Sequence, residues 1–353
     1  MLSFDDEMVS WTTPQYSRAQ VDRAGAMLID LSVSFREREE AWEIANNWRS
    51  SHSYPLNHFQ VALRQKANQI DPSNLVAQRL KRRSSIELKL KDNSAMKLSQ
   101  MQDLGGCRAI VATIAHVDKL VELYDVSRMN HERLRTYDYI REPKDSGYRG
   151  IHLVYRYISH SERGGPYDGL RIEVQLRSPL QHAWATAVEI AGTFTGQALK
   201  SSHGSQDWLR FFQLMGTEIA LQEKSAPVPD TPTDNAQLVK ELRSCVRDLD
   251  VIHLLQAWTR SIKAHEDQVL PNAHYFRVEL DANTQRLTIT SYAKNQIEQA
   301  QQEYTQREQA LRGQPGADVV LVSGVSLKEL PRAYPNYYLD TTAFVRELER
   351  AIS

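Results

Sequence analysis

The chain has 353 residues, with 43 Lys and Arg against 44 Asp and Glu, and a formal net charge of −1. Hydrophobic residues make up 41% and charged residues 25%, which is typical of a globular protein and excludes a disordered chain. The length favours two domains. No apolar run approaches the roughly 18 residues that span a bilayer. We expect no membrane partner, and no signal peptide, because the first residues are acidic and lack a basic stretch followed by an apolar one. The only cysteines are Cys107 and Cys245, which favours a reducing, cytoplasmic location.

Residues 1–74 predict a helical cover. Apolar residues recur at spacings of three, four and seven from Tyr16 to Asn47, which indicates an amphipathic helix. A second helix is predicted from Asn57 to Ala67, with one face apolar. The sequence Asp71-Pro-Ser-Asn74 ends this region with a break and a helix-cap signal.

Residues 75–224 predict a domain with a mixed β-sheet and flanking helices, in an α/β (α+β) fold class. The predicted elements are a basic helix over Leu75–Leu90, a strand over Ala109–Ile114, a helix over His116–Tyr124, strands over Gly150–Tyr157 and Leu170–Leu176, and a helix over Gln181–Ala198. The second of the later strands alternates strictly, with apolar residues on one face and Arg171, Glu173, Gln175 and Arg177 on the other.

Residues 225–235 contain three prolines and predict a linker. Residues 236–353 predict a separate small α+β domain with a regulatory role. Its expected elements are a helix over Leu238–Ile262, a hairpin of Tyr275–Leu280 with Arg286–Tyr292, a helix over Ala293–Leu311, a strand over Asp318–Val322 and a helix over Thr341–Ile352.

Basic residues gather at the start of the predicted middle domain. Six Lys or Arg and one Glu lie between Arg79 and Lys91. Residues 76–180 hold 19 Lys and Arg and 13 Asp and Glu, a local charge of +6 within a nearly neutral chain. Fixed cations pair with phosphate oxygens, so this segment is a candidate clamp for polyphosphate or nucleic acid. A solvated helix face is the alternative.

Two carboxylates are candidates for chemistry. Asp103 precedes a Gly-Gly turn, and Glu173 lies on the polar face of a strand. Carboxylates in such places can hold Mg²⁺ together with substrate phosphates, or act as a general base. Each could instead be a cap or an ion-pair partner, and their spacing of 70 residues does not show that they meet.

A loop rich in Pro, Gly and Tyr runs from Tyr137 to His152 and includes Lys144 and Tyr148. Loops held by a rigid scaffold often carry function, and a tyrosine can stack on a nucleobase. An ordinary turn with a surface tyrosine is the alternative.

Taken in order, these segments resemble the RelA/SpoT nucleotidyltransferase (alarmone synthetase) domain over about Leu75 to Gly196. The matching blocks are Arg79-Leu-Lys81 with Ser85-Ile86 and Lys89, Asp103-x-x-Gly106-x-Arg108, Asp138-Tyr-Ile-x-x-Pro-Lys144-x-x-Gly-Tyr148-Arg, His152, and Glu173-Val-Gln-Leu-Arg177. Five blocks in the right order are far more specific than any one of them.

The resemblance implies transfer of the β,γ-pyrophosphate of ATP to a ribose 3′-hydroxyl. It implies that Asp103 and Glu173 are catalytic and bind Mg²⁺. The ATP-binding residues would be Arg79, Lys81, Lys89, Arg108 and Lys144, and the acceptor side would be lined by Tyr148, His152, Gln175 and Arg177. Ser146 stands where the family usually has Asn, and His116 where it often has a second adenine-stacking Arg.

The C-terminal third resembles the CapRel-type group of toxic small alarmone synthetases fused to an antitoxin domain. Tyr334 and Tyr337 match that group's Tyr-x-x-Tyr element. The likeness implies that the enzyme modifies the 3′-CCA end of tRNA, that these tyrosines block the ATP site from one helical face, and that a phage protein releases them. The tyrosines could instead only attach the last helix to the core. A (p)ppGpp synthetase acting on GDP or GTP, and a catalytically dead regulatory protein, are the other hypotheses.

Overall fold

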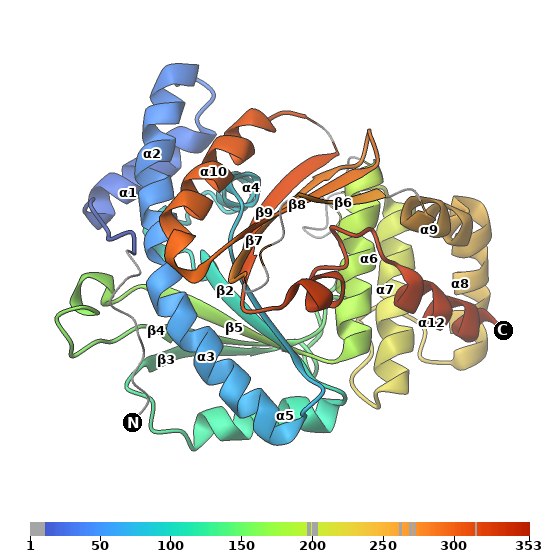
Figure 1. Cartoon of the computed structure of the whole chain (residues 1–353). Helices are drawn as coiled ribbons and strands as arrows, with labels where there is room; N and C mark the ends of the chain where they lie inside the picture. Colours follow the sequence, from blue (N-terminus) through green and yellow to red (C-terminus); the bar gives the residue numbers. More distant parts are fainter. Residues whose placement is uncertain are drawn as a thin grey trace.

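A computed structural model describes residues 11–195, 199, 204–260, 263–267, 270, 273–314 and 316–353. Its centre is one mixed sheet of nine strands in the order β3-β4-β5-β2-β1-β9-β7-β8-β6. Figure 1 shows this sheet crossing the molecule, with helices on both sides. The strands are β1 (Leu75–Leu80), β2 (Gly105–Ile110), β3 (Glu132–Asp138), β4 (Ile151–Arg156), β5 (Arg171–Arg177), β6 (Lys263–Asp267), β7 (Tyr275–Asp281), β8 (Arg286–Tyr292) and β9 (Ala317–Ser323). The expected fold class is confirmed.

The N-terminal region is helical as expected, but its first stripe is two helices rather than one. They are α1 (Arg18–Ile29) and α2 (Phe35–Ser51), and α3 (Ser53–Ile70) follows. Ser34 caps α2, and its hydroxyl and backbone are bonded to Glu37 in a capping box. The sequence Ser-x-x-Glu at 34–37 marks the start of this second helix, which the spacing of apolar residues alone does not reveal.

The prediction of a helix over Leu75–Leu90 was wrong in its first half. Residues 75–80 form β1, and α4 (Arg83–Asp92) begins only afterwards. Strand β1 is bonded on both sides, antiparallel to β2 and to β9. Its buried residues Leu75, Val76 and Ala77 face two different cores, which a helical stripe could not do.

The strands of the middle region separate a packed face from an open face. Helices α3 and α5 (Ile114–Asp125) pack against the sheet, where Cys107, Ala109, Ile172 and Val174 join the largest core cluster. The alternate residues of the same strands point to the other face. That face is flanked by α6 (Pro179–Thr195) and α7 (Gln206–Gln222). Their aromatic residues form a second core with three later helices, α8 (Asn235–Leu249), α9 (Val251–Arg260) and α12 (Thr342–Ile352).

Several predicted elements differ in their ends. Strand β2 begins four residues before the expected strand because the Gly-Gly pair lies inside it, and β3 was not predicted. The helix expected over Leu238–Ile262 is α8 (Asn235–Leu249) and α9 (Val251–Arg260), broken at Asp250, whose φ is 51°. Ile262 lies outside the described residues, as do residues 196–198 of the helix predicted after Gln181.

The C-terminal third contains the expected hairpin, β7 with β8. It also contains α10 (Ile297–Ala310), the short α11 (Leu330–Ala333) and α12 (Thr342–Ile352). Strand β6, which was not predicted, pairs with β8. The sheet continues from β9 into β1, where Gln78 lies opposite Ser323 and Arg79 opposite Val322. The linker expected at 225–235 is therefore not a break in the sheet.

Gly147 offers a test of this packing. Its φ is +91°, and an added Cβ would lie 2.8 Å from the carbonyl oxygen of Phe212. Gly147→Ala should therefore lower the free energy of unfolding by about 2–3 kcal/mol in urea titrations. Gly165→Ala, where an added Cβ meets nothing within 4 Å, should change it by less than about 0.5 kcal/mol. Equal effects would contradict the close approach of α7 to this loop.

Candidate active site

The open face of the sheet borders a cleft of about 1260 Å³. The cleft brings together every predicted site residue except Tyr337. The lining includes Arg79, Lys81, Lys89, Asp103, Arg108, Lys144, Tyr148, His152, Glu173, Gln175, Arg177 and Tyr334. These residues come from segments up to 255 positions apart in the chain, so the fold gathers the motifs that the sequence only placed in order.

Strand register explains this convergence. Strands β2 and β5 are parallel, with Gly106 opposite Glu173 and Arg108 opposite Gln175. Strand β1 runs antiparallel to β2, which places Arg79 opposite Gly106. Because side chains alternate along a strand, these residues share one face. The glycine at 106 leaves the space between Arg79 and Glu173 free of a side chain.

Asp103 is held by two cations. Its carboxylate accepts hydrogen bonds from Lys81 Nζ at 2.8 Å and Lys89 Nζ at 2.9 Å. Burial raises the pKa of this carboxyl, but the two lysines outweigh burial and hold the pKa well below its usual range. Asp103 is therefore ionised at neutral pH. Its carboxylate is the partner of the two lysine ammonium groups, which could otherwise contact phosphates.

Glu173 is the second buried carboxylate of the cleft. Its Oε1 lies 2.9 Å from His152 Nδ1, and its Oε2 accepts a hydrogen bond from Gln175 Nε2 at 2.6 Å. Burial and the charge of Asp103 raise the pKa of Glu173, while His152 and Gln175 lower it, with a net lowering. The repulsion from Asp103 shows that the two carboxylates share one electrostatic environment.

Tyr148 is part of a buried polar chain rather than an exposed ring. Tyr148 is only 8% exposed. Its hydroxyl lies 2.6 Å from His152 Nε2 and accepts a hydrogen bond from Arg177 Nη2 at 2.6 Å. Burial raises the phenol pKa, but Arg177 and His152 lower it to about 8. Burial lowers the pKa of His152, whereas Tyr148 and Glu173 raise it to about 9.

Arg108 faces the C-terminal third. Its Nη2 donates a hydrogen bond to the carbonyl oxygen of Ala333, and its guanidinium lies 5.5 Å from the centre of the Tyr334 ring. Burial and the charge of Arg177 lower the pKa of Arg108 to about 10. The Nε atoms of Arg108 and Arg177 are buried without a hydrogen-bond partner among the described residues. The cleft therefore has unused cationic donors.

Tyr334 and Tyr337 are both buried, but they are not on one helical face. Helix α11 ends at Ala333, and the Tyr337 amide donates to the Tyr334 carbonyl oxygen in the turn that follows. Tyr334 donates its hydroxyl proton to the carbonyl oxygen of Gln78 at 2.7 Å. Tyr337 Oη accepts a hydrogen bond from Arg82 Nη1 at 3.4 Å, beside the cleft. The expectation that Tyr334 and Tyr337 share one helical face was wrong, because the helix ends at Ala333 and the chain turns there.

Sequence reasoning missed two residues of this contact. His182 on α6 is buried, and its Nε2 lies 3.2 Å from the carbonyl oxygen of Arg332. Arg82 Nη2 donates a hydrogen bond to Glu189 of α6 at 3.0 Å and also pairs with Asp318 of β9. His182 lies five residues after the end of the Glu173 block, and Arg82 lies inside the basic segment, so position near motifs was the available signal.

The chemistry of the carboxylates fits Mg²⁺. Among the described residues there is no cluster of three or more His, Cys, Asp or Glu that could form an all-protein metal site. Magnesium, however, is usually held by one or two carboxylates together with substrate phosphates and waters. Asp103 and Glu173 provide two carboxylates in a cleft that is also lined with Lys and Arg side chains, which are able to pair with phosphate.

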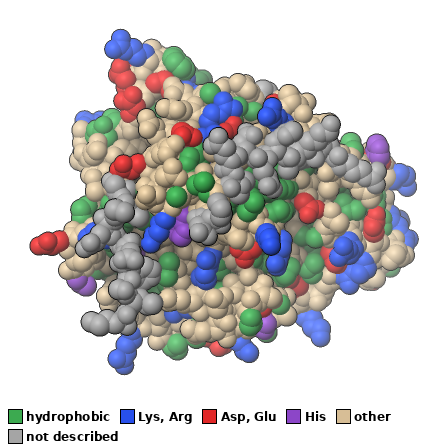
Figure 2. Space-filling view, viewed as in Figure 1, with side chains coloured by type: hydrophobic (Ala, Val, Ile, Leu, Met, Phe, Trp, Pro, Cys, Tyr) green, Lys and Arg blue, Asp and Glu red, His purple; other side chains and the backbone are tan. Residues whose placement is uncertain are grey.

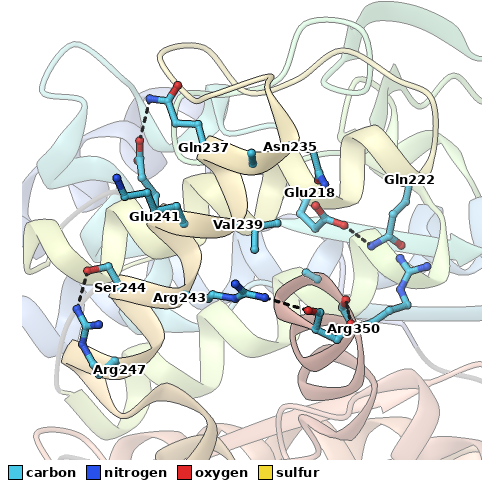
Figure 3. A pocket seen from close by; sticks show the side chains of 14 residues that line it. Glu218, Gln222, Asn235, Gln237, Val239, Glu241, Arg243, Ser244, Arg247 and Arg350 are labelled. Atoms are coloured by element: carbon cyan, nitrogen blue, oxygen red, sulfur yellow. Dashed lines mark hydrogen bonds between the residues drawn. The ribbon is translucent and has the colours of Figure 1, made fainter.

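A second hollow of about 1090 Å³ lies between α7, α8 and α12, away from the predicted residues. Figure 3 shows Arg243 pointing to the C-terminal end of α12, where it donates to the carbonyl oxygen of Ser353. The lining of this hollow contains the cations Lys240 and Arg350 as well as the anions Glu218 and Glu241. Charges of both signs are also interspersed on the visible face in Figure 2. No helix of the described residues combines the length and apolarity needed to cross a membrane.

Residues 78–193 match the family described as the region found in RelA/SpoT proteins. The GTP pyrophosphokinase YjbM of Bacillus subtilis (strain 168) is 30% identical over 117 residues, which are 33% of this chain and 54% of that protein. The chain thus spans about half the length of this curated relative. These matches show that the middle of the chain is similar to the region found in RelA/SpoT proteins.

The solved structures that match part of this chain include small alarmone synthetase 1 from Bacillus subtilis bound to its product pppGpp. That structure has a TM-score of 0.42 and 21% identity, and the match covers 48% of this chain and 88% of the other. A GTP pyrophosphokinase family protein from Streptococcus pneumoniae has a TM-score of 0.40 and 20% identity, with 56% and 92% of the two chains covered.

The buried tyrosine chain makes a testable prediction about pH. The folded-state pKa of Tyr148 is about 8, below the ordinary value of 10, so the folded protein loses this proton before the unfolded chain does. Tyrosinate absorbance should therefore show a step near pH 8 from one of the 15 tyrosines. The same group should add stability as the pH rises from about 8 to 10.

Tyr148→Phe should remove this step, and Arg177→Met should move it to higher pH because the nearby cation is lost. A step that persists unchanged in Tyr148→Phe would show that the phenol is not perturbed as described.

Proposed function

We propose that the chain is an ATP-dependent pyrophosphokinase that transfers the β,γ-pyrophosphate of ATP to a ribose 3′-hydroxyl. The observation that supports this proposal most strongly is the shared cleft, in which two carboxylates and several Lys and Arg side chains face one another. Phosphoryl and pyrophosphoryl transfer depend mainly on positioning and charge neutralisation, which this set of residues can supply. The family match over residues 78–193 supports the same reaction.

In the proposed reaction the acceptor's 3′-oxygen forms a bond to the β-phosphorus, and the bond from that phosphorus to the oxygen bridging to the α-phosphate breaks. AMP leaves with that bridging oxygen. Glu173 takes the proton of the hydroxyl, and His152 orients its carboxylate through the 2.9 Å contact. Arg108, Lys81 and Lys89 bind the phosphates. Mg²⁺ held by Asp103 and Glu173 would neutralise phosphate charge.

The acceptor side would be formed by Tyr148, His152, Gln175 and Arg177, with Lys144 nearby. Lys144 Nζ lies 4.5 Å from the Tyr139 ring centre and 5.5 Å from that of Tyr148. Because Tyr148 is buried, stacking on an acceptor base requires its ring to leave the contacts with His152 and Arg177. Stacking on the acceptor base would therefore use a conformation of the Tyr148 side chain that differs from the one described.

We propose the 3′-CCA end of tRNA as the acceptor, with inhibition of translation and phage defence as the outcome. The excess of 19 Lys and Arg over 13 Asp and Glu in residues 76–180 supports a polynucleotide. A (p)ppGpp synthetase acting on GDP or GTP is the second candidate, favoured by the 30% identity to a GTP pyrophosphokinase.

We further propose that the C-terminal third inhibits the enzyme until a partner, such as a phage protein, displaces it. Arg108, an expected ATP ligand, is bonded to the Ala333 carbonyl oxygen and covered by Tyr334. His182 contacts the Arg332 carbonyl oxygen and Arg82 contacts the Tyr337 hydroxyl, so both contact the same segment. A nucleotide phosphate at Arg108 would have to replace these contacts.

Acceptor identity can be tested with ATP labelled at the γ-phosphate, mixed with deacylated tRNA and with GDP or GTP. Label on the tRNA 3′ end is the expected result, whereas label only on the guanine nucleotide would support the second candidate.

Glu173→Gln should lower the transfer rate by at least about a hundredfold, because it removes the proposed base and metal ligand. Transfer at the unchanged rate would contradict the catalytic assignment.

A further inference from the structure

A fully buried arginine joins the N-terminal helices to the C-terminal third. Arg49 of α2 is 0% exposed, and its guanidinium lies 4.8 Å from the Trp42 ring centre and 5.1 Å from that of Tyr304 on α10. It donates hydrogen bonds to Asn46 and to the carbonyl oxygen of Lys81. Figure 1 shows α10 lying beside α2.

The negative charge that neutralises Arg49 comes from the far end of the chain. Arg49 Nη1 lies 2.8 Å from Glu308 Oε2. Within the described ranges, Glu308 is the only carboxylate that forms an ion pair with Arg49. Tyr304 also donates its hydroxyl proton to Glu308 at 2.8 Å. Separating α10 from α2 would leave a buried cation unpaired, which is strongly unfavourable.

Glu308 has a second role, because it completes the start of α4. The N-cap residue of α4, Arg82, has no side-chain cap of its own. Instead, the Arg83 amide donates to Glu308 Oε1 at 2.7 Å. A carboxylate at a helix N-terminus satisfies a free amide and interacts favourably with the helix dipole. Glu308 thus caps, from 225 positions away, the helix that carries Lys89.

Further ion pairs surround this contact. Arg83 pairs with Glu39 of α2 at 2.7 Å and with Glu87 of α4 at 2.8 Å. Arg312, which follows α10, pairs with the same Glu39 and lies 3.6 Å from Glu87. Of these pairs, only those of Arg312 join the C-terminal third to α2 and α4. The Arg312 side chain is 30% exposed, whereas that of Arg49 is 0% exposed, so the Arg312 pairs contribute less than the pair of Arg49 with Glu308.

We propose that Glu308 is a latch that holds the C-terminal third over the ATP side of the cleft. The proposal rests on the proposed self-inhibited enzyme and adds the element that stabilises its closed state. Tyr334 lines the cleft, and Glu308 holds α10 against α2 and the start of α4. Release requires Arg49 and the α4 N-terminus to lose the same carboxylate together, which makes opening cooperative.

The test compares Glu308→Gln with Glu303→Gln in the full chain. Glu303 lies on the same helix but pairs with Arg277 and Tyr292, both in the C-terminal third. Hydrogen–deuterium exchange without nucleotide is the primary measurement. Glu308→Gln should accelerate exchange at least about tenfold in residues 83–86 and 297–308 and in residues 330–337, while Glu303→Gln should not affect residues 83–86.

A fluorescent, non-hydrolysable ATP analogue provides the second measurement. Glu308→Gln should increase its affinity at least about tenfold, toward that of a chain with Tyr334→Ala and Tyr337→Ala. The double substitution Arg49→Met with Glu308→Leu replaces the ion pair by apolar side chains and should restore slow exchange in residues 330–337. This variant keeps the test valid if Glu308→Gln is poorly folded.

Unchanged exchange in residues 330–337 of Glu308→Gln, or equal acceleration in Glu303→Gln, would overturn the latch. Failure of the double substitution to restore slow exchange would also overturn it. These measurements require no turnover, so they are independent of the labelled-acceptor assay. A latch without pyrophosphate transfer and transfer without a latch are therefore distinguishable results.

Discussion

The pairing of β1 with strands on both of its edges is the constraint on which the rest of the structure depends. One edge is bonded to β2, which carries Arg108, and the other to β9 of the C-terminal third. This pairing fixes the register of the two halves, so the segment after α11 reaches the cleft at Arg108 and Tyr334 donates to the backbone of β1 itself. One sheet therefore positions both the cleft and the Ala333–Tyr334 segment that covers Arg108.

Several of the cations of the cleft, though not every nitrogen of Arg108 and Arg177, are paired with groups of the protein. Asp103 occupies Lys81 and Lys89, and the Ala333 carbonyl oxygen occupies one nitrogen of Arg108. Buried charge without a partner is costly, so such pairing stabilises the fold without nucleotide. It also means that phosphate binding would be an exchange of partners. Regulation by the C-terminal third would follow from the same exchange, because both compete for one set of donors.

The sequence predicted which residues gather in one cleft better than it predicted the ends of the helices and strands. Motif order identified residues as distant as Arg79 and Arg177, and strand alternation placed Glu173 and Gln175 on one polar face, as the structure has them. The helix predicted at Leu75 failed because tertiary pairing on both edges overrides local helix propensity. The joining of the two halves was also missed, since β1 and β9 meet through backbone bonds that leave no side-chain pattern.

The latch was equally hidden from sequence analysis. Arg49 and Glu308 are 259 positions apart, and a lone charged residue on a helix usually lies on a solvated face. Tyr334 and Tyr337 were found by resemblance, but their turn geometry depends on where α11 ends. Burial of Tyr148 could not be read from its loop, because α6 and α7 supply the aromatic residues around it. Contacts between distant segments account for each of these gaps.

The most direct test of a cleft covered by its own chain is hydrogen–deuterium exchange of residues 330–337 with and without a non-hydrolysable ATP analogue and Mg²⁺. If nucleotide and the Ala333–Tyr334 segment compete for Arg108, saturating analogue must release that segment, because coupling between two binding events is reciprocal. Exchange in residues 330–337 should then rise at least about tenfold, while β7 and β8 stay protected. Bound analogue with unchanged exchange in these residues would contradict the competition.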